Sequence, residues 1–279
     1  MRRLWLLAVV LISGCTSLTT LYFFPQSVWV ATPAESGLDY QDLYLRAADE
    51  TELHAWWIPA QGEAPASDTV VLYLHGNAEN ISSHARTVYW LTQKGVGVLA
   101  LDYRGFGAST GQALFPDVLQ DVDAALRWLR TGQADKKIVI LAQSIGTAVA
   151  VDYLAKAGGG QGITALVLDA PIARFGSVAR HAFSQSVVGW VLWPFTVLLP
   201  SRDDPIEHID KLHLPVLILH SQSDKVVPYE QGQRLYQTWR QRHPEQTLCW
   251  QESKGGHVMS FAFPELRQAT LAFILNAKC

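Results

Sequence analysis

Ser144 has the surroundings expected of a nucleophile. It lies at the centre of residues 142–146, which read AQSIG and nearly match the pattern G-x-S-x-G. An apolar, β-branched run (137–141) precedes this segment, and small residues (146–150) follow it. In the pattern, a sharp strand-to-helix turn exposes the serine hydroxyl above a sheet, and small flanking residues are needed because neighbouring backbone passes close by. We therefore predict that Ser144 is a nucleophile, with Ala142 in place of the usual first glycine.

Two later loops offer the partners that a serine needs, namely a base within hydrogen-bond reach and a third group that orients this base. Asp224 comes shortly after an apolar strand pattern (216–220), so we expect it at the carboxyl edge of a sheet, where ligands bind in open α/β folds. His257 follows a short strand pattern (248–251) and ends a glycine-rich loop. This order predicts His257 as the base and Asp224 as the acid that orients it.

Other acidic residues and histidines compete with these three. Asp169 ends the strand pattern 166–168 and is a rival for the orienting acid, although we interpret it as anchoring its own loop. Asp102 comes too early in the chain, and we expect it to fix its loop with Arg104. His220 ends a strand and is interpreted as structural. The chain has nine histidines, and none are paired with the spacing of zinc ligands, so we expect neither a metal nor another cofactor.

Acyl transfer also requires hydrogen-bond donors aimed at the oxygen that becomes negatively charged. The apolar strand pattern 70–74 is followed by His75, Gly76 and Asn77. This loop is typical of an oxyanion hole and would offer the backbone N–H of Asn77. The second donor would be the N–H of Ile145, directly after the nucleophile. An ordinary strand-to-helix loop with a flexible glycine is the alternative interpretation.

The elements that must position these residues alternate along the chain. Residues 43–47 and 53–58 predict an opening antiparallel hairpin. From residue 70 onward, strand patterns alternate with helical ones, which predicts a mostly parallel central sheet with helices on both faces. The helices are expected at 83–94, 116–130, 145–157, 229–241 and 264–276. Pro116 and Pro264 suit the first position of their helices, where a missing N–H does no harm.

Residues 171–210 break this alternation, and we predict a short helical cap there. The stretch 184–200 within it is mostly apolar and includes Trp190 and Trp193. We interpret these two tryptophans as substrate-binding residues of a lid that forms a wall for an acyl chain. The alternative is a helix that packs on the sheet without touching substrate.

Five segments of the chain resemble the α/β-hydrolase superfamily. They read HGN at 75–77, DYRGFG at 102–107, QSIGT at 143–147, SDKVVP at 223–228 and GH at 256–257. Within the superfamily, the chain is most similar to the depalmitoylase-like membrane-associated serine hydrolases, from about residue 22 to the C-terminus. The resemblance implies an α/β-hydrolase fold and a triad of Ser144, Asp224 and His257. It does not fix the substrate, because one fold hosts many functions.

The first residues resemble a bacterial lipoprotein signal. Arg2 and Arg3 precede an apolar stretch (4–12) that is too short to span a bilayer, and residues 12–15 read ISGC. In such signals the cysteine becomes the lipidated first residue, so we expect a signal peptide at 1–14 and lipidation at Cys15. An uncleaved signal anchor is the alternative. Thr16 favours the outer over the inner membrane of a bacterial cell envelope that has two membranes.

A tether is expected at 15–37, ahead of the hydrolase domain at 38–279. An aromatic cluster in this tether either packs on the domain or lies at the lipid surface. It consists of Tyr22, Phe23, Phe24 and Trp29.

The composition fits a protein that meets apolar partners. Hydrophobic residues make up 49% of the chain and charged residues 17%, and the net charge is −3, which leaves no electrostatic footprint for nucleic acid. The chain has ten tryptophans, which suit contact with apolar substrates or with a membrane surface. A large core also accounts for the high share of hydrophobic residues. Cys249 and Cys279 remain beside Cys15, and in an oxidising compartment they either pair or stay free.

The sequence thus predicts a lipid-anchored serine hydrolase that cleaves ester or thioester bonds of small or lipid-like acyl substrates. A peptidase of the same fold is the competing enzyme. A non-catalytic envelope lipoprotein that uses the fold for interactions is the competing protein of another class.

Overall fold

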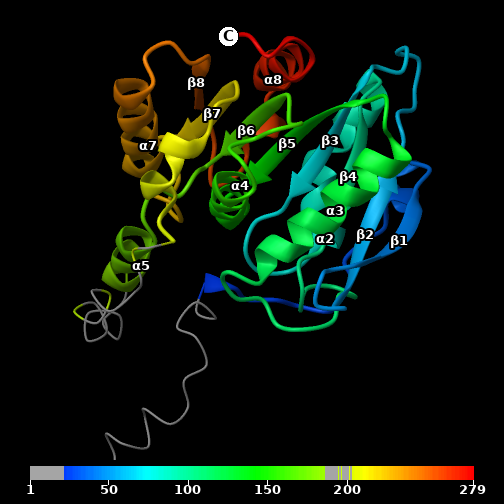
Figure 1. The fold of residues 1–279 in the computed structure, drawn as a ribbon, viewed down its shortest axis with the longest axis horizontal. Helices are drawn as coiled ribbons and strands as arrows, with labels where there is room; N and C mark the ends of the chain where they lie inside the picture. Colours follow the sequence, from blue (N-terminus) through cyan, green and yellow to red (C-terminus); the bar gives the residue numbers. More distant parts are fainter. Residues whose placement is uncertain (1–21, 186–193, 195, 197–200, 202) are drawn as a thin grey trace, which may run out of the picture.

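The computed structural model describes residues 22–185, 194, 196, 201 and 203–279. Its fold is built on one eight-stranded sheet (Figure 1). The order across the sheet is β1-β2-β4-β3-β5-β6-β7-β8. β1 pairs antiparallel with β2, as the predicted hairpin requires. β2 also pairs antiparallel with β4, and all further pairs are parallel. The strands are β1 Gln41–Arg46, β2 Glu52–Ile58, β3 Thr69–Leu74, β4 Gly97–Leu101, β5 Lys137–Gln143, β6 Ala165–Asp169, β7 Val216–Ser221 and β8 Leu248–Ser253. The mostly parallel sheet confirms the predicted fold class.

Helices on both faces of this sheet explain why its central strands read as continuous apolar runs. Leu72 and Leu74 of β3 point into one core layer, which the helices α3 Val118–Gly132, α4 Ile145–Lys156 and α7 Tyr229–Arg242 cover. Val71 and Tyr73 point into the other layer, which contains apolar residues of α8 Pro264–Asn276. Alternate residues of one strand thus serve two cores.

The helix predicted at 83–94 is wrong as a single element. The chain instead forms α2 Ile81–His84 and two 3₁₀ turns, η3 Ala85–Thr87 and η4 Tyr89–Lys94. The hydroxyl of Thr87 donates to the carbonyl of His84 and that of Thr92 to the carbonyl of Tyr89. Such local side-chain bonds to the backbone compete with regular helix geometry, which accounts for the broken element.

Pro264 occupies the start of α8 as predicted, whereas Pro116 does not start its helix. α3 begins at Val118, and residues 115–117 form a turn, so Pro116 belongs to the turn before the helix.

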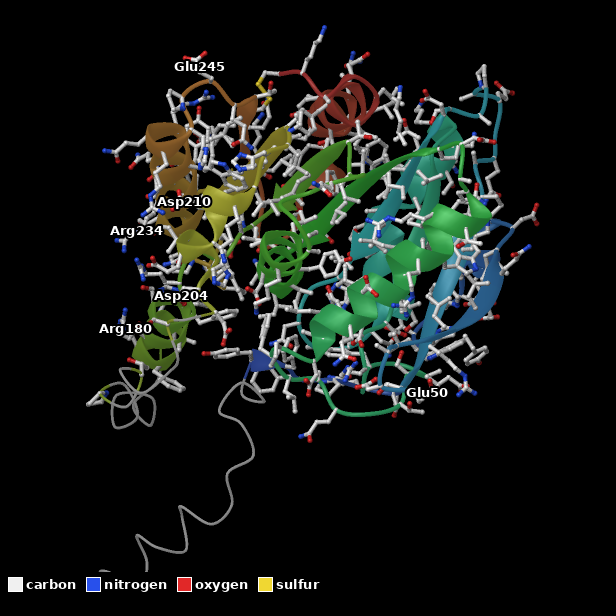
Figure 2. The ribbon with its side chains drawn as sticks, viewed as in Figure 1. Glu50, Arg180, Asp204, Asp210, Arg234 and Glu245 are labelled. Atoms are coloured by element: carbon white, nitrogen blue, oxygen red, sulfur yellow. A yellow bond between two sulfur atoms is a disulfide. The ribbon has the colours of Figure 1, made fainter. Side chains whose placement is uncertain are left out.

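Between β6 and β7 lies the region predicted as a cap. Its described part contains α5 Phe175–Ser184 and the 3₁₀ turns η6 Pro205–Glu207 and η7 Ile209–Lys211. The N–H of Phe175 donates to Asp204, which Figure 2 labels close to α5. Trp190 and Trp193 lie outside the described residues.

The first described residues of the N-terminal segment, Tyr22 and Phe23, pack on the domain. The ring of Tyr22 stacks on Phe175 of α5 at 4.2 Å between centroids, and Phe23 contacts Phe106 and Phe115. Of the two placements left open for the aromatic cluster, Tyr22 and Phe23 take the packed one, whereas Phe24 is 60% exposed. None of the described helices is both long and apolar enough to cross a bilayer.

Cys249 and Cys279 form a disulfide between positions 30 apart in the sequence. The bond ties the start of β8 to the residues after α8, at the top of Figure 1. This is the end of the sheet opposite to the carboxyl ends of its parallel strands.

We expect Cys279→Ala to lower the free energy of unfolding by about 2–4 kcal/mol, because the unfolded chain regains the entropy that the cross-link removed. Thermal unfolding with and without dithiothreitol measures this. The reductant should lower the Tm of the wild-type protein to that of the variant and leave the variant unchanged. Equal Tm values for oxidised and reduced wild-type protein would contradict the role of the bond.

Candidate active site

Ser144 occupies the turn between β5 and α4 in a conformation that few residues adopt, with φ 53° and ψ −121°. The geometry explains the small residue that follows. A Cβ on Gly146 would lie 2.4 Å from the carbonyl oxygen of Leu74 and 2.7 Å from that of His75. The N–H of Ser144 donates to the carbonyl of Asp169 at 3.0 Å. Neighbouring strands therefore hold the turn on two sides.

His257 brings Ser144 and Asp224 into one chain of hydrogen bonds. Its Nε2 lies 2.9 Å from the Ser144 Oγ and its Nδ1 lies 2.7 Å from the Asp224 Oδ2. A carboxylate can only accept, so the Nδ1 carries the proton and the Nε2 is free to accept the serine proton. The arrangement can move a proton from Ser144 to His257 while Asp224 stabilises the resulting imidazolium.

Asp224 is held in its ionised form. Burial raises the pKa of its carboxyl, but hydrogen bonds from His220 and His257 outweigh this and leave the pKa well below its usual range. The other oxygen, Oδ1, accepts the N–H groups of Val226 and Val227, both at 2.9 Å. These bonds also fix the direction of the carboxylate toward His257.

His220 is the residue that sequence reasoning undervalued. Its Nε2 lies 3.0 Å from the carbonyl of Val227 and 3.5 Å from the Asp224 Oδ2, so its ring supports the acid loop. α7 packs a glycine against that ring, since a Cβ on Gly232 would lie 2.2 Å from the His220 Nδ1. The position of His220 at the end of β7, four residues before Asp224, was the available signal.

Asp169, the rival acid, has other partners. Its buried carboxylate accepts the hydroxyl of Ser260 at 2.6 Å and the side-chain N–H of Gln143 at 2.8 Å. Burial raises the pKa of this carboxyl. Asp169 therefore joins the residue before the nucleophile to the loop that carries His257.

The loop predicted to form an oxyanion hole passes directly over the serine. A Cβ on Gly76 would lie 3.5 Å from the Cβ of Ser144. The side-chain oxygen of Asn77 accepts the N–H groups of Ala78 and Phe24, both at 2.8 Å. Ile145 begins α4, and the first N–H groups of a helix have no partner within it. The use of the Asn77 and Ile145 N–H groups as oxyanion donors stays a prediction.

His75 serves the core rather than the chemistry. It is fully buried, its Nδ1 lies 2.7 Å from the carbonyl of Gly76, and burial holds its pKa well below the usual range. Its ring packs on Tyr103 at 4.6 Å between centroids. A neutral, buried ring thus anchors the loop at residues 75–77 in the core.

The predicted pairing of Asp102 with Arg104 is wrong. Arg104 points toward α3, where its Nε donates to Asp121 at 2.8 Å, and its Nη1 donates to Asp49 at 2.7 Å. Asp102 accepts the N–H of Ile81 at 2.8 Å instead. Asp102 and Arg104 are two residues apart but take partners on different elements, so closeness in sequence did not bring the two charges together.

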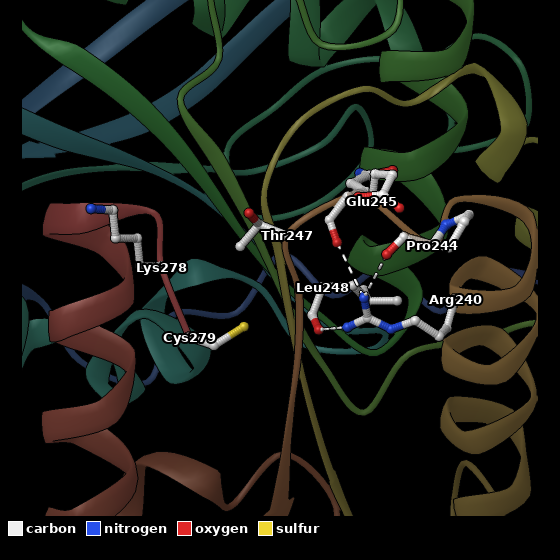
Figure 3. Close-up of a pocket in the computed structure, with 8 residues that line it drawn as sticks. Arg240, Pro244, Glu245, Thr247, Leu248, Lys278 and Cys279 are labelled. Atoms are coloured by element: carbon white, nitrogen blue, oxygen red, sulfur yellow. Dashed lines mark hydrogen bonds between the residues drawn. The ribbon is translucent and has the colours of Figure 1, made fainter.

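A pocket of about 360 Å³ lies at the opposite end of the sheet, beside the disulfide (Figure 3). Arg240 and Lys278 both line it, and the guanidinium of Arg240 already donates to the carbonyls of Pro244, Gln246 and Leu248. Through these bonds Arg240 stabilises the turn before β8. Among the described residues, no group of three His, Cys, Asp or Glu side chains could hold a metal ion.

Comparison with known proteins groups this chain with hydrolases. Residues 65–205 match the family described as serine aminopeptidase, S33. The uncharacterized protein YfhR of Salmonella typhi is 31% identical, over 94% of this chain and 89% of that protein. The lysophosphatidylserine lipase ABHD12 of Danio rerio is 27% identical, over 94% of this chain and 80% of the lipase. The Pyrococcus furiosus esterase Pf2001 has the same fold, with a TM-score of 0.75 and 22% identity over 91% of this chain and 97% of the esterase.

We expect Asp224→Asn to lower kcat by roughly 10⁴-fold, because an amide facing the Nδ1 of His257 favours the wrong tautomer. Asp169→Asn is the matched control and should cost far less, since an asparagine oxygen can still accept from Gln143 and the Ser260 hydroxyl can accept the amide N–H. Steady-state hydrolysis of a chromogenic ester by both variants measures the difference. The reverse ranking would move the orienting acid to Asp169.

Proposed function

This chain belongs to the α/β-hydrolase family described as serine aminopeptidase, S33, and from that premise we propose that it is a serine hydrolase working through Ser144, His257 and Asp224. The observation that carries the proposal is the unbroken chain of hydrogen bonds from Ser144 through His257 to Asp224, at 2.9 and 2.7 Å.

The reaction follows from these contacts. The Ser144 Oγ attacks the acyl carbonyl while the His257 Nε2 takes its proton, and the N–H groups of Asn77 and Ile145 hold the oxyanion. His257 then returns the proton to the leaving group, which departs and leaves an acyl group on Ser144. Water, deprotonated by His257, releases the acid. Asp224 stays ionised throughout and stabilises the imidazolium in both halves of the reaction.

The substrates are esters or thioesters with apolar acyl groups. Two relatives are named as an esterase and a lysophosphatidylserine lipase, which supports ester cleavage.

A peptidase is the second candidate, favoured by the description of the family itself. An exopeptidase needs a charged group that binds a peptide terminus. Arg174, at the start of α5, is already paired with Asp204 at 3.3 Å, and it also pairs with Glu207. Because Arg174 is already paired, it is not a free charge for a peptide terminus, and we favour the esterase over the peptidase. A purely structural lipoprotein ranks lowest, because it has no use for a strained serine aligned with a histidine.

Lipid anchoring through Cys15 completes the proposal and places the enzyme in a bacterial cell envelope, at the outer membrane where there are two. The signal-like residues 1–15 support it. The Cys249–Cys279 disulfide agrees with an oxidising compartment outside the cytoplasm.

A fluorophosphonate probe should modify Ser144, and Ser144→Ala should abolish both labelling and turnover. Losing a triad serine costs on the order of 10⁶ in kcat. Gel fluorescence and ester hydrolysis measure the two effects, and Ser260→Ala, which keeps the nucleophile, controls for general damage near His257. Full turnover by the Ser144→Ala protein would end the proposal.

The rate on esters should depend on acyl length. Each buried methylene contributes about 0.8 kcal/mol, so four extra carbons would add roughly 3 kcal/mol of binding. We expect kcat/KM to rise from acetyl to medium-chain esters, and Trp190→Ala or Trp193→Ala to flatten that rise without slowing acetyl hydrolysis. Equal kcat/KM values of the wild-type protein across the ester series would contradict the proposal that the cap binds the acyl chain.

Cys15→Ala should block lipidation and leave an unprocessed precursor. Incorporation of labelled palmitate during growth, followed by gel fluorography, measures this. Palmitate on the variant would show that Cys15 is not the lipidated residue.

A further inference from the structure

Exposed apolar side chains gather at the catalytic edge of the sheet. Among the described residues, the large hydrophobic side chains that stand exposed are Phe24, Val28, Trp29, Val30, Tyr44, Val226, Met259 and Leu275. All but Leu275 can be placed at the end of the sheet that carries the triad.

Three of them border the triad directly. The N–H of Phe24 donates to Asn77 in the oxyanion loop. The N–H of Val226 donates to Asp224. Met259 is two residues past His257 and is 49% exposed.

The next three lie on a strap, residues 24–30, that crosses the loops after β3 and β4. The side chain of Asn80 donates to the carbonyls of Gln26 and Val28, and the N–H of Val30 donates to the Ser82 Oγ. These loops follow the carboxyl ends of their strands, so the strap runs along the same edge. Val28 and Val30 are 74% and 61% exposed.

Register places Tyr44 beside the strap. Tyr44 of β1 is opposite His54 of β2, and the next residue, Ala55, is opposite Leu101, the last residue of β4. The rings of Trp29 and Tyr44 both contact His54, at 5.1 and 5.5 Å between centroids. The apolar surface therefore continues from the triad to the edge strand.

The exception, Leu275, lies at the opposite edge. It is near the end of α8, four residues before the cysteine that bonds to the start of β8. The asymmetry matters because soluble monomers rarely gather exposed apolar side chains on one side without a partner for them.

We propose that the catalytic edge docks on a lipid bilayer through Val28, Trp29 and Val30 of the strap, so that an acyl ester reaches Ser144 directly from the membrane. This deepens the proposed hydrolase and rests on it for the identity of the substrate. Only six residues separate Cys15 from Tyr22, a span of at most about 25 Å, so a lipid on Cys15 would hold this edge near the bilayer.

The charges at this edge specify the kind of lipid surface. Glu79 and Lys225 are exposed there with opposite signs, and the turn from β1 to β2 adds the exposed ion pair of Arg46 with Glu50. Attraction to anionic lipid needs clustered basic residues, whereas apolar insertion does not. The surface therefore fits a zwitterionic bilayer, and its binding should be insensitive to salt.

The test uses the full-length lipidated protein in phosphatidylcholine vesicles. It compares hydrolysis of a long-chain ester embedded in the vesicles with that of a short-chain ester dissolved in water. The double variant Val28→Ser/Val30→Ser should cleave the embedded ester at least about fivefold more slowly and the dissolved ester at the wild-type rate. Leu275→Ser, exposed on the opposite edge, is the matched control and should leave both rates unchanged.

Two kinetic outcomes would overturn the proposal. An unchanged rate on the embedded ester would show that the strap does not meet lipid. An equal fall in the rates on both esters would show that the strap only supports the site. A third outcome concerns the oligomeric state: if the double variant changes from dimer to monomer and hydrolyses the embedded ester at the wild-type rate, the surface binds a second copy of the chain.

A readout independent of turnover separates this proposal from the proposed function. Brominated phosphatidylcholine should quench the tryptophan fluorescence of the wild-type protein more than that of Trp29→Phe. If wild-type protein cleaves neither ester but shows this difference, docking stands and the proposed substrate is wrong. Equal quenching of the two proteins overturns docking whatever the activity.

Discussion

The strained turn at Ser144 is the constraint on which the rest of the site depends. Its φ of 53° is costly for a residue with a side chain, by an estimated 1–3 kcal/mol, and persists only where the surroundings determine it. Gly146 lets the start of α4 lie against the carbonyls of Leu74 and His75, and the carbonyl of Asp169 binds the N–H of Ser144. The parallel sheet is the frame that brings these three strands to one edge.

Two carboxylates near one histidine take different roles because their environments differ, as in other enzymes that pair acidic groups. Asp224 receives hydrogen bonds from two backbone N–H groups and from His257, which favour its charged form. Asp169 is buried deeper, and its bonds to Gln143 and Ser260 link the nucleophile turn to the base loop. In the proposed mechanism one carboxylate stabilises the imidazolium of His257, whereas the other joins two loops.

The sequence predicted the candidate site best where a serine, an acid or a histidine lies in a loop directly after an apolar strand. Loops after apolar strands placed Ser144, Asp224 and His257 at one edge, and the geometry brings all three together. Contacts between residues distant in sequence were not visible in it, such as Ser260 with Asp169 or Arg104 with Asp121. The pairing of Cys249 with Cys279 was left open for the same reason. Local competition by threonine hydroxyls likewise broke a helix that apolar spacing alone predicted.

The central claim is that Ser144 carries the acyl group during turnover. Rapid acid quench of the enzyme mixed with a slow ester, followed by mass spectrometry of the peptide that contains Ser144, tests it most directly. The account predicts that this peptide transiently gains the mass of the acyl group and loses it as water completes the reaction. Steady turnover with no acyl group on Ser144, or with the acyl group on another residue, would contradict it.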